Sequence, residues 1–147
     1  MTETLATLRQ PSIFIPHGGG PCFFMPDPQG MWSGMAEYLR GLIASLPEKP
    51  RAILIISGHW EADGFAFTGA EAHPGLIYDY YGFPPHTYEI AWPAPGAPWL
   101  ARRGAELLQE AGLPASVDPQ RGFDHGVFVP MKVAVPDADI PTVQEDR

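Results

Sequence analysis

The sequence predicts an α/β fold with a central, mostly parallel sheet flanked by helices. Short apolar runs rich in β-branched residues alternate with longer amphipathic stretches, which is the pattern of strand–helix–strand units. Hydrophobic residues make up 45% of the 147 positions, enough for a buried core, and 18 prolines with 16 glycines favour long ordered loops over a helical bundle.

The first half of the chain contains three predicted strands and one predicted helix. Residues 12–16 (SIFIP) indicate a short buried strand, and residues 31–46 carry apolar side chains at i, i+3 and i+4, which predicts an amphipathic helix that ends at Pro47. The almost wholly apolar run 51–57 (RAILIIS) is typical of a strand covered on both faces. A third strand is predicted within residues 64–69 (GFAFTG).

The second half begins with a long excursion from about residue 70 to 98 that shows no clear period. A second helix follows over 97–113, with an inward face predicted to consist of Trp99, Leu100, Leu107, Leu108 and Ala111. Residues 115–117 indicate a short strand, 127–135 are ambiguous between helix and strand, and 140–144 indicate a last buried strand. Because this strand leads directly into the last residues, EDR, we expect a sheet that is truncated at its C-terminal end.

Charge and cysteine content exclude several classes of partner. The net charge of −8, without a basic stripe, argues against nucleic acid and anionic membranes. Cys22 is the single cysteine, so no internal disulfide is available and a reducing compartment is expected. The first ten residues hold no apolar leader core, and no run has the length of a membrane span. These features predict a cytoplasmic protein.

Two of the five histidines follow the strongest predicted strands. His17 comes after IFIP and His59 after ILIISG, and ligands of open α/β sheets bind at the carboxyl ends of strands. Imidazole is the commonest ligand of transition metals, and Gly18 and Gly19 would leave room for a substrate beside an ion. Histidines satisfied by backbone carbonyls are the alternative, and the residue types alone leave both interpretations open.

Other motifs are weaker. The triple glycine is not followed by Gly-Lys-Ser/Thr, and Pro21 lacks an N–H group, so a phosphate loop is not indicated. Ser57 and His59 lie too close in sequence for a nucleophile–base pair, and no nucleophile elbow is present. Glu61 is open to two interpretations, a carboxylate near a metal or a solvated acid.

His125 and an aromatic segment are further candidates. His125 lies in a predicted loop (RGFDHGVFVP), where it would serve as an acid, a base or a hydrogen-bond donor to substrate, or simply pack within the loop. The excursion carries aromatic residues, which suit the wall of a pocket for a flat ligand or ordinary core packing. Tyr81 and Phe83 are the candidates for substrate contact within it, and neither His73 nor His86 is expected to be a ligand.

Four segments in order, PSIFIPHGGGPCFF, ILIISGHWE, HPGLIYDYYGFP and GFDHGVFVPMK, resemble the DOPA-dioxygenase-type extradiol ring-cleavage dioxygenases of the class III (protocatechuate 4,5-dioxygenase B-subunit) superfamily. The resemblance runs from about residue 11 to 144. It implies one mononuclear Fe(II) or Zn(II) site with His17 and His59 as ligands. His125 would be an active-site histidine that is not a ligand and that contacts the substrate or oxygen.

The resemblance also implies a reaction and a departure from the family. The substrates would be a small aromatic diol, DOPA-like, and O2, with the ring opened beside the diol. Members of the family continue further and supply a third ligand and a catalytic base for which this sequence has no counterpart, so residues 1–147 read as the N-terminal portion of one catalytic domain. Two alternatives stay open: a zinc-dependent hydrolase, and an inactive fragment that binds metal or associates through an unfinished sheet edge.

Overall fold

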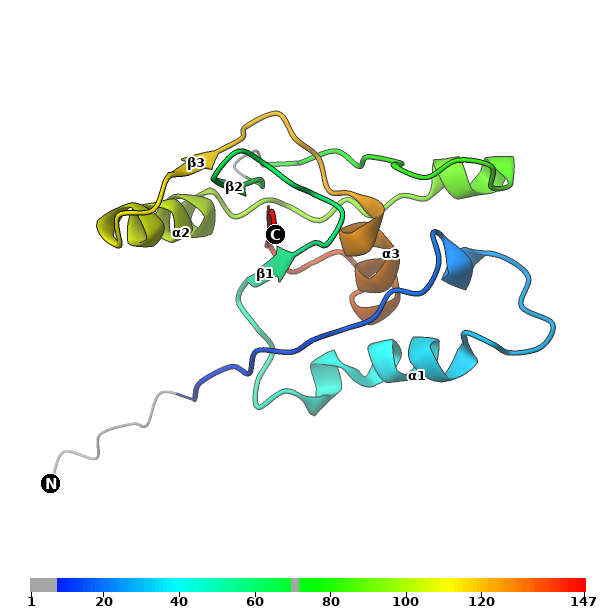
Figure 1. Ribbon diagram of the computed structural model, residues 1–147. Coiled ribbons are helices and arrows are strands. Elements are labelled where there is room, and N and C mark those ends of the chain that lie inside the picture. The colour runs from blue at the N-terminus through cyan, green and yellow to red at the C-terminus, as the bar shows by residue number, and fades with distance from the viewer. Residues whose placement is uncertain (1–7, 70–71) are drawn as a thin grey trace, which may run out of the picture.

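The computed structural model describes residues 8–69 and 72–147, and over them the chain forms an α/β arrangement (Figure 1). Most of the N-terminal stretch inspected for a leader, and the first two residues of the predicted excursion, lie outside the described residues. In chain order the main elements are α1 (Ser33–Gly41), β1 (Ile53–Ile56), β2 (Phe65–Phe67), α2 (Pro98–Glu110), β3 (Ala115–Val117), α3 (His125–Ala134) and β4 (Thr142–Glu145).

The four strands form one mixed sheet in the order β1-β4-β2-β3. Two of its ladders are parallel: β1 pairs with β4 from Ile53↔Thr142 to Ile56↔Glu145, and β2 pairs with β3. The single pair Phe67↔Glu145 joins β2 to β4 in antiparallel orientation. The predicted α/β class with a mostly parallel sheet is therefore confirmed, and β4 lies inside the sheet between the two parts that precede it in sequence.

The helices enclose two apolar cores. α1 packs against α3 on one side of the molecule, and α2 packs on β2 and β3 on the other (Figure 1). The larger core surrounds α3 and holds the buried rings of Trp92, Phe123 and Phe128. The smaller core lies between α2 and the sheet, where Phe67 meets Val143 and the alanines of α2.

The segment that the sequence left ambiguous is the helix α3. Asp124 caps it by accepting a hydrogen bond from the backbone N–H of Gly126 (3.0 Å). Val127, Phe128 and Val129 are all fully buried, so the helix is apolar all round and shows no amphipathic period. His125 is the first residue of this helix, and its predicted place in a loop is wrong.

Two other local predictions are wrong because the expected packing partners differ. Residues 12–16 form no strand, and Phe14 is 94% exposed, since within the described residues no strand pairs with this segment. β1 is covered on one face only: Leu54 and Ile56 are 46% and 62% exposed, while Ile53 and Ile55 pack against the core.

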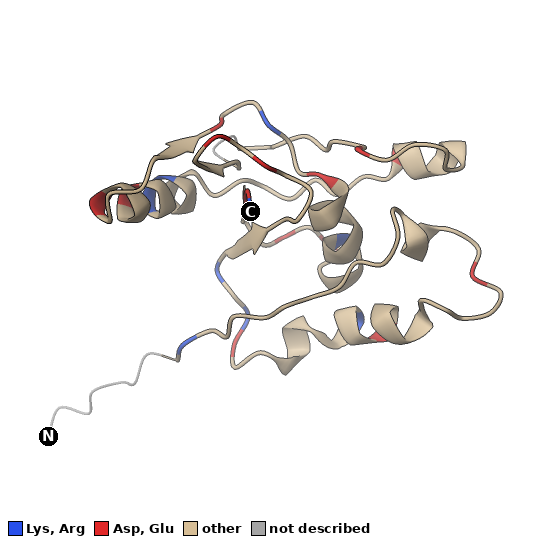
Figure 2. Ribbon diagram, in the orientation of Figure 1, with Lys and Arg blue, Asp and Glu red and all other residues tan. Residues whose placement is uncertain are grey.

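α2 buries only part of the face that was predicted: Leu100 and Leu108 pack against the smaller core, but other residues of that face do not. Trp99 and Leu107 are about half exposed, whereas Ala101 and Ala105 are buried. The reason is a close approach: a Cβ on Gly104 would lie 2.7 Å from the ring of Phe67, so small residues must face the sheet. Figure 2 marks acidic and basic residues along α2. Among the exposed ones, Arg103 lies 3.6 Å from Glu106 and 3.4 Å from Glu110.

No helix in the described part of the chain is both long enough and apolar enough to cross a bilayer.

Candidate metal centre

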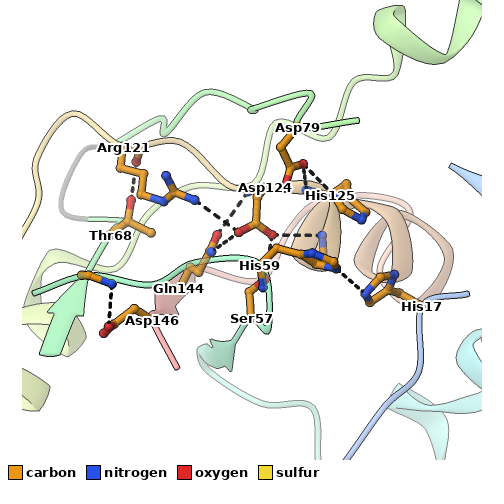
Figure 3. Close-up of polar contacts among 12 residues, drawn as sticks. His17, Ser57, His59, Thr68, Asp79, Arg121, Asp124, His125, Gln144 and Asp146 are labelled. Carbon is orange, nitrogen blue, oxygen red and sulfur yellow. Dashed lines mark hydrogen bonds and ion pairs between the residues drawn. The ribbon is translucent and has the colours of Figure 1, made fainter. Parts of the chain in front are cut away.

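Three histidines from separate segments meet at one point of the structure (Figure 3). His17 comes from the N-terminal segment, His59 lies just beyond β1, and His125 is the first residue of α3. The Nε2 atoms of His17 and His59 are 2.9 Å apart. The ring centroid of His125 lies 4.1 Å from that of His59 and 5.2 Å from that of His17. The predicted convergence of His17 and His59 is thus present, and His125 joins them.

A buried carboxylate ties together the elements beneath this cluster. Asp124 is fully buried and accepts hydrogen bonds from Ser57 Oγ (2.8 Å) at the end of β1 and from Gln144 Nε2 (2.5 Å) of β4. Arg121 Nη2 lies 3.3 Å from Oδ2 of Asp124, the same oxygen that accepts from Gln144. Ser57 Oγ in turn accepts a hydrogen bond from the backbone N–H of His59 (3.2 Å). The side chain of Asp124 therefore links the ends of β1 and β4 to the start of α3.

Gly126 allows the ring of His59 to lie against the start of α3. A Cβ built at this position would be 2.9 Å from His59 Cδ2 and 2.6 Å from Ser57 Oγ. Cβ atoms do not make contacts this short, so only glycine fits here with His59 in its observed place.

His125 is held by a carboxylate from a distant segment. Asp79 Oδ1 accepts both the backbone N–H of His125 (2.9 Å) and a hydrogen bond from its ring Nδ1 (2.6 Å). Burial opposes ionisation of Asp79, but these hydrogen bonds outweigh it and hold the pKa of Asp79 below its ordinary value. The carboxylate is thus kept charged, and Nδ1 of His125 is engaged away from the other two histidines.

His17 follows an extended segment and precedes a tight glycine turn. Gly18 has φ +71°, and a Cβ there would lie 2.5 Å from Cys22 Sγ, so the turn requires glycine. The Cys22 thiol donates to the His17 carbonyl at 3.4 Å. Burial lowers the pKa of His17, and its neighbours His125 and His59 lower it further. The neutral imidazole, which is the form that binds metal, is thereby favoured.

The donor set fits a transition-metal ion. The ligand atoms that the three histidines offer lie within 4.8 Å of one another, and no other cluster of three His, Cys, Asp or Glu side chains with this property exists in residues 8–69 and 72–147. His17 Nδ1 is buried and finds no hydrogen-bond partner among the described residues. Imidazole nitrogen is a preferred ligand of zinc and iron, and one ion holds such nitrogens at about 2.0–2.1 Å.

The other candidate ligands that the sequence offered lie outside the histidine cluster. Glu61 pairs with Arg147 and does not belong to the cluster. His86 Nε2 lies 2.7 Å from the Phe24 carbonyl, so His86, like His73, lies outside the group, as predicted.

The predicted substrate-contact residues are spread over two segments. Gly19 has open space where a side chain would be, and Tyr81 is 91% exposed. Phe83 packs against the ring of buried Tyr80 (centroids 5.4 Å apart), and Tyr80 lies 5.7 Å from the ring of His125. An aromatic wall therefore leads from Phe83 through Tyr80 to the cluster.

The sequence analysis missed Asp124 and Gln144 beneath the cluster, and it also missed Asp79. Its signal was faint: a single acid inside the aromatic run IYDYY, 46 positions away from the histidine it contacts. A charged residue kept among aromatic neighbours is a reason to look for a buried partner, but the sequence does not say which one.

An α/β fold in which three imidazoles from separate segments converge defines a candidate metalloprotein, and comparison with known proteins gives the family. Residues 12–144 match the family described as the catalytic LigB subunit of aromatic ring-opening dioxygenase. The chain belongs to this family of dioxygenases, in agreement with the resemblance that its four motifs show.

Individual relatives agree with the family assignment. Dioxygenase tasH of Hapsidospora irregularis is 44% identical over 91% of this chain and 43% of its own length. The 4,5-DOPA dioxygenase extradiol of Escherichia coli is 38% identical over 95% of this chain and 48% of its own. The crystal structure of an uncharacterized protein from E. coli K12 superposes with a TM-score of 0.57 at 37% identity, covering 76% of this chain and 39% of that one. The chain thus spans about half the length, or less, of these relatives.

Proposed function

We propose that this chain carries the metal-binding portion of an extradiol ring-cleavage dioxygenase that acts on a small catechol-type diol. His17 and His59 would hold a single Fe(II) or Zn(II) ion, and His125 would contact the diol or O2. The observation that carries this proposal is the meeting of three imidazoles, from segments far apart in sequence, in a chain of the ring-opening dioxygenase family.

The chemistry of the surrounding residues supports these roles. When bound, such an ion supplies Lewis-acid polarisation and a template for two reactants. His17 contributes a neutral imidazole, and His59 is exposed and open to solvent on one side. The rings of Tyr80 and Phe83, which meet edge to face, offer apolar contacts for an aromatic substrate. His125, with Nδ1 occupied by Asp79, retains Nε2 for hydrogen bonding to the substrate.

The relatives narrow the substrate class. Several are named 4,5-DOPA dioxygenase extradiol, so an aromatic diol with DOPA as the first compound to test is the natural choice. Because the chain covers half or less of these proteins, catalytic activity has to be measured on this chain itself. We propose residues 1–147 as one N-terminal portion of a single catalytic domain.

The decisive experiment measures metal binding and oxygen uptake separately. Zn(II) and anaerobic Fe(II) affinities are determined for the wild-type chain and for His17→Ala, His59→Ala and the control His73→Ala, which removes an exposed imidazole outside the cluster. Removal of a ligand should weaken metal binding by at least about tenfold in His17→Ala and His59→Ala, and His73→Ala should bind like the wild type. Changes to residues that only support the ligands already cost about 10–100-fold in metal affinity. Unchanged affinity in both would refute the ligand assignment.

Oxygen uptake by the Fe(II)-loaded chain with DOPA then tests the reaction. Uptake that depends on His125 supports a working dioxygenase site. A folded, Fe(II)-loaded chain that consumes no oxygen would contradict activity of this chain and would favour a metal-binding portion of the domain. Metal-dependent hydrolysis without oxygen uptake would instead support the zinc hydrolase alternative.

A further inference from the structure

We propose that Asp79 is a positioning residue that fixes the tautomer and orientation of His125, so that Nε2 is the ring nitrogen left free to accept a hydrogen bond in the histidine cluster. The proposal deepens the function given above and rests on it for its catalytic meaning. The structural part of the proposal involves only the side chains of Asp79 and His125.

The geometry of the pair leaves one tautomer. An ionised carboxylate is an acceptor only, so ring Nδ1, 2.6 Å from Asp79 Oδ1, must carry the proton. The same oxygen accepts the backbone N–H of His125 at 2.9 Å, which fixes the carboxylate relative to the histidine backbone as well as to the ring. In the neutral imidazole, Nε2 then has the lone pair.

The start of α3 also favours a carboxylate in this place. The backbone N–H of His125 is one of the groups at a helix N-terminus that have no partner within the helix, and the positive end of the helix attracts an anion. The side chain of Asp79 is only 24% exposed, so water competes weakly for these hydrogen bonds.

The segment that carries Asp79 is fixed on both sides. Before it, Leu76 forms a bridge with Phe123, and Ile77 N–H donates to the Phe123 carbonyl at 2.7 Å, two residues from His125. After it, the Tyr80 hydroxyl donates to the Thr87 carbonyl. The distance between Asp79 and His125 is therefore set by backbone pairing and not by a free loop.

The arrangement has a direct chemical consequence. With Nε2 unprotonated, His125 accepts a proton or hydrogen bond from a hydroxyl of the diol, whereas the opposite tautomer would present an N–H group there. The carboxylate also keeps the ring from rotating about its χ angles, which preserves the direction of Nε2.

The test reads the tautomer directly in the metal-free chain. Long-range ¹H–¹⁵N correlation spectra of the imidazoles are recorded at alkaline pH, where histidine is neutral, and the His125 signals are identified by their loss in His125→Gln. We expect the Nδ1–H pattern in the wild type and in the control Asp137→Asn, an equal charge change at an exposed site beyond α3. Asp79→Ala should lose this pattern, and the isosteric Asp79→Asn should retain it in part.

Two results would overturn the proposal: an Nε2–H pattern for His125 in the wild type, or an unchanged Nδ1–H pattern in Asp79→Ala. The wild-type spectrum decides the first point without any variant. If the alanine variant does not fold, an Nδ1–H population in Asp79→Asn equal to that of the wild type would overturn the proposal instead. Because no turnover is needed, unchanged metal affinity in His17→Ala and His59→Ala together with the expected tautomer would refute the proposed function and leave the role of Asp79 intact. In an active chain, Asp79→Ala should lower kcat at least tenfold with Fe(II) content unchanged, and an unaltered kcat would contradict the positioning role.

Discussion

Replacement of Gly126 by alanine tests whether the histidine cluster depends on the close approach of β1 to α3. The new Cβ would lie 2.9 Å from His59 Cδ2. Favourable carbon–carbon contact begins at about 3.5 Å, so the ring of His59 must retreat by at least about 0.6 Å. Functional groups that hold a ligand tolerate displacements of only about 0.5 Å, and metal sites still less.

Gly126→Ala should lower the free energy of unfolding less than it weakens metal binding. Overpacking costs about 1–3 kcal/mol, and alanine regains up to about 1 kcal/mol over glycine within a helix. The net loss of about 0–2 kcal/mol should leave the secondary structure visible by circular dichroism. We therefore expect a folded chain whose Zn(II) affinity, measured by competition with a chromophoric chelator, is about 10–100-fold weaker, a range typical of disturbed ligand orientation.

Gly34→Ala provides the matched control. Gly34 is the second residue of α1, as Gly126 is of α3, and nothing lies within 4 Å of the position its Cβ would take. This variant should bind Zn(II) like the wild type. Equal affinity of Gly126→Ala and Gly34→Ala would show that His59 is not held against α3, and the argument from close approach would fail.

Three further predictions concern stability of the metal-free chain. Asp124→Ala removes the shared acceptor of Ser57 and Gln144 and leaves Arg121 without its buried partner. The free energy of unfolding, measured by urea denaturation, should fall by about 3–5 kcal/mol. A fall under about 1 kcal/mol would contradict the role of Asp124 in holding these elements together. Phe123→Ala empties a fully buried position and should cost about 3–5 kcal/mol in the same assay, unless the core there collapses around the gap. Burial, and to a lesser extent Asp146, raises the pKa of Glu145. The charged form therefore destabilises the fold as pH rises above the ordinary pKa of glutamate. Glu145→Gln should be more stable than the wild type at neutral pH and equally stable in acid, and a stability difference that does not change with pH would refute this cause.

The sequence predicted those features that depend on local pattern. β1, β2, β3, β4 and both amphipathic helices were found because apolar period and turn residues act over a few positions. The approach of His17 to His59 was predicted from the general rule that ligands bind at the carboxyl ends of strands, but only His59 follows a strand, since residues 12–16 form none.

What the sequence did not predict depends on contacts between distant segments. The burial of α3 on all sides hid its helical period, and the exposed outer face of β1 depends on which elements cover the sheet. The contact of Asp79 with His125 joins an irregular segment to a helix start, and no spacing rule connects the two. Likewise, the face that α2 buries is set by the ring of Phe67 opposite Gly104.

The placement of β4 has a consequence for the order of folding. Among the residues that the structure describes, β1 pairs with β4 alone, and β2 pairs with β3 and β4, so these two parts of the sheet are not joined until β4 enters between them. Its residues follow β1 by 89 positions in the register Ile53↔Thr142, a separation that carries a large loop-closure cost and delays sheet assembly. Gln144 of the same strand donates to Asp124 under the histidines. Until β4 is in place, the chain has its three imidazoles but no common support for them, and metal capture should therefore be a late event that reports the insertion of β4 into the sheet.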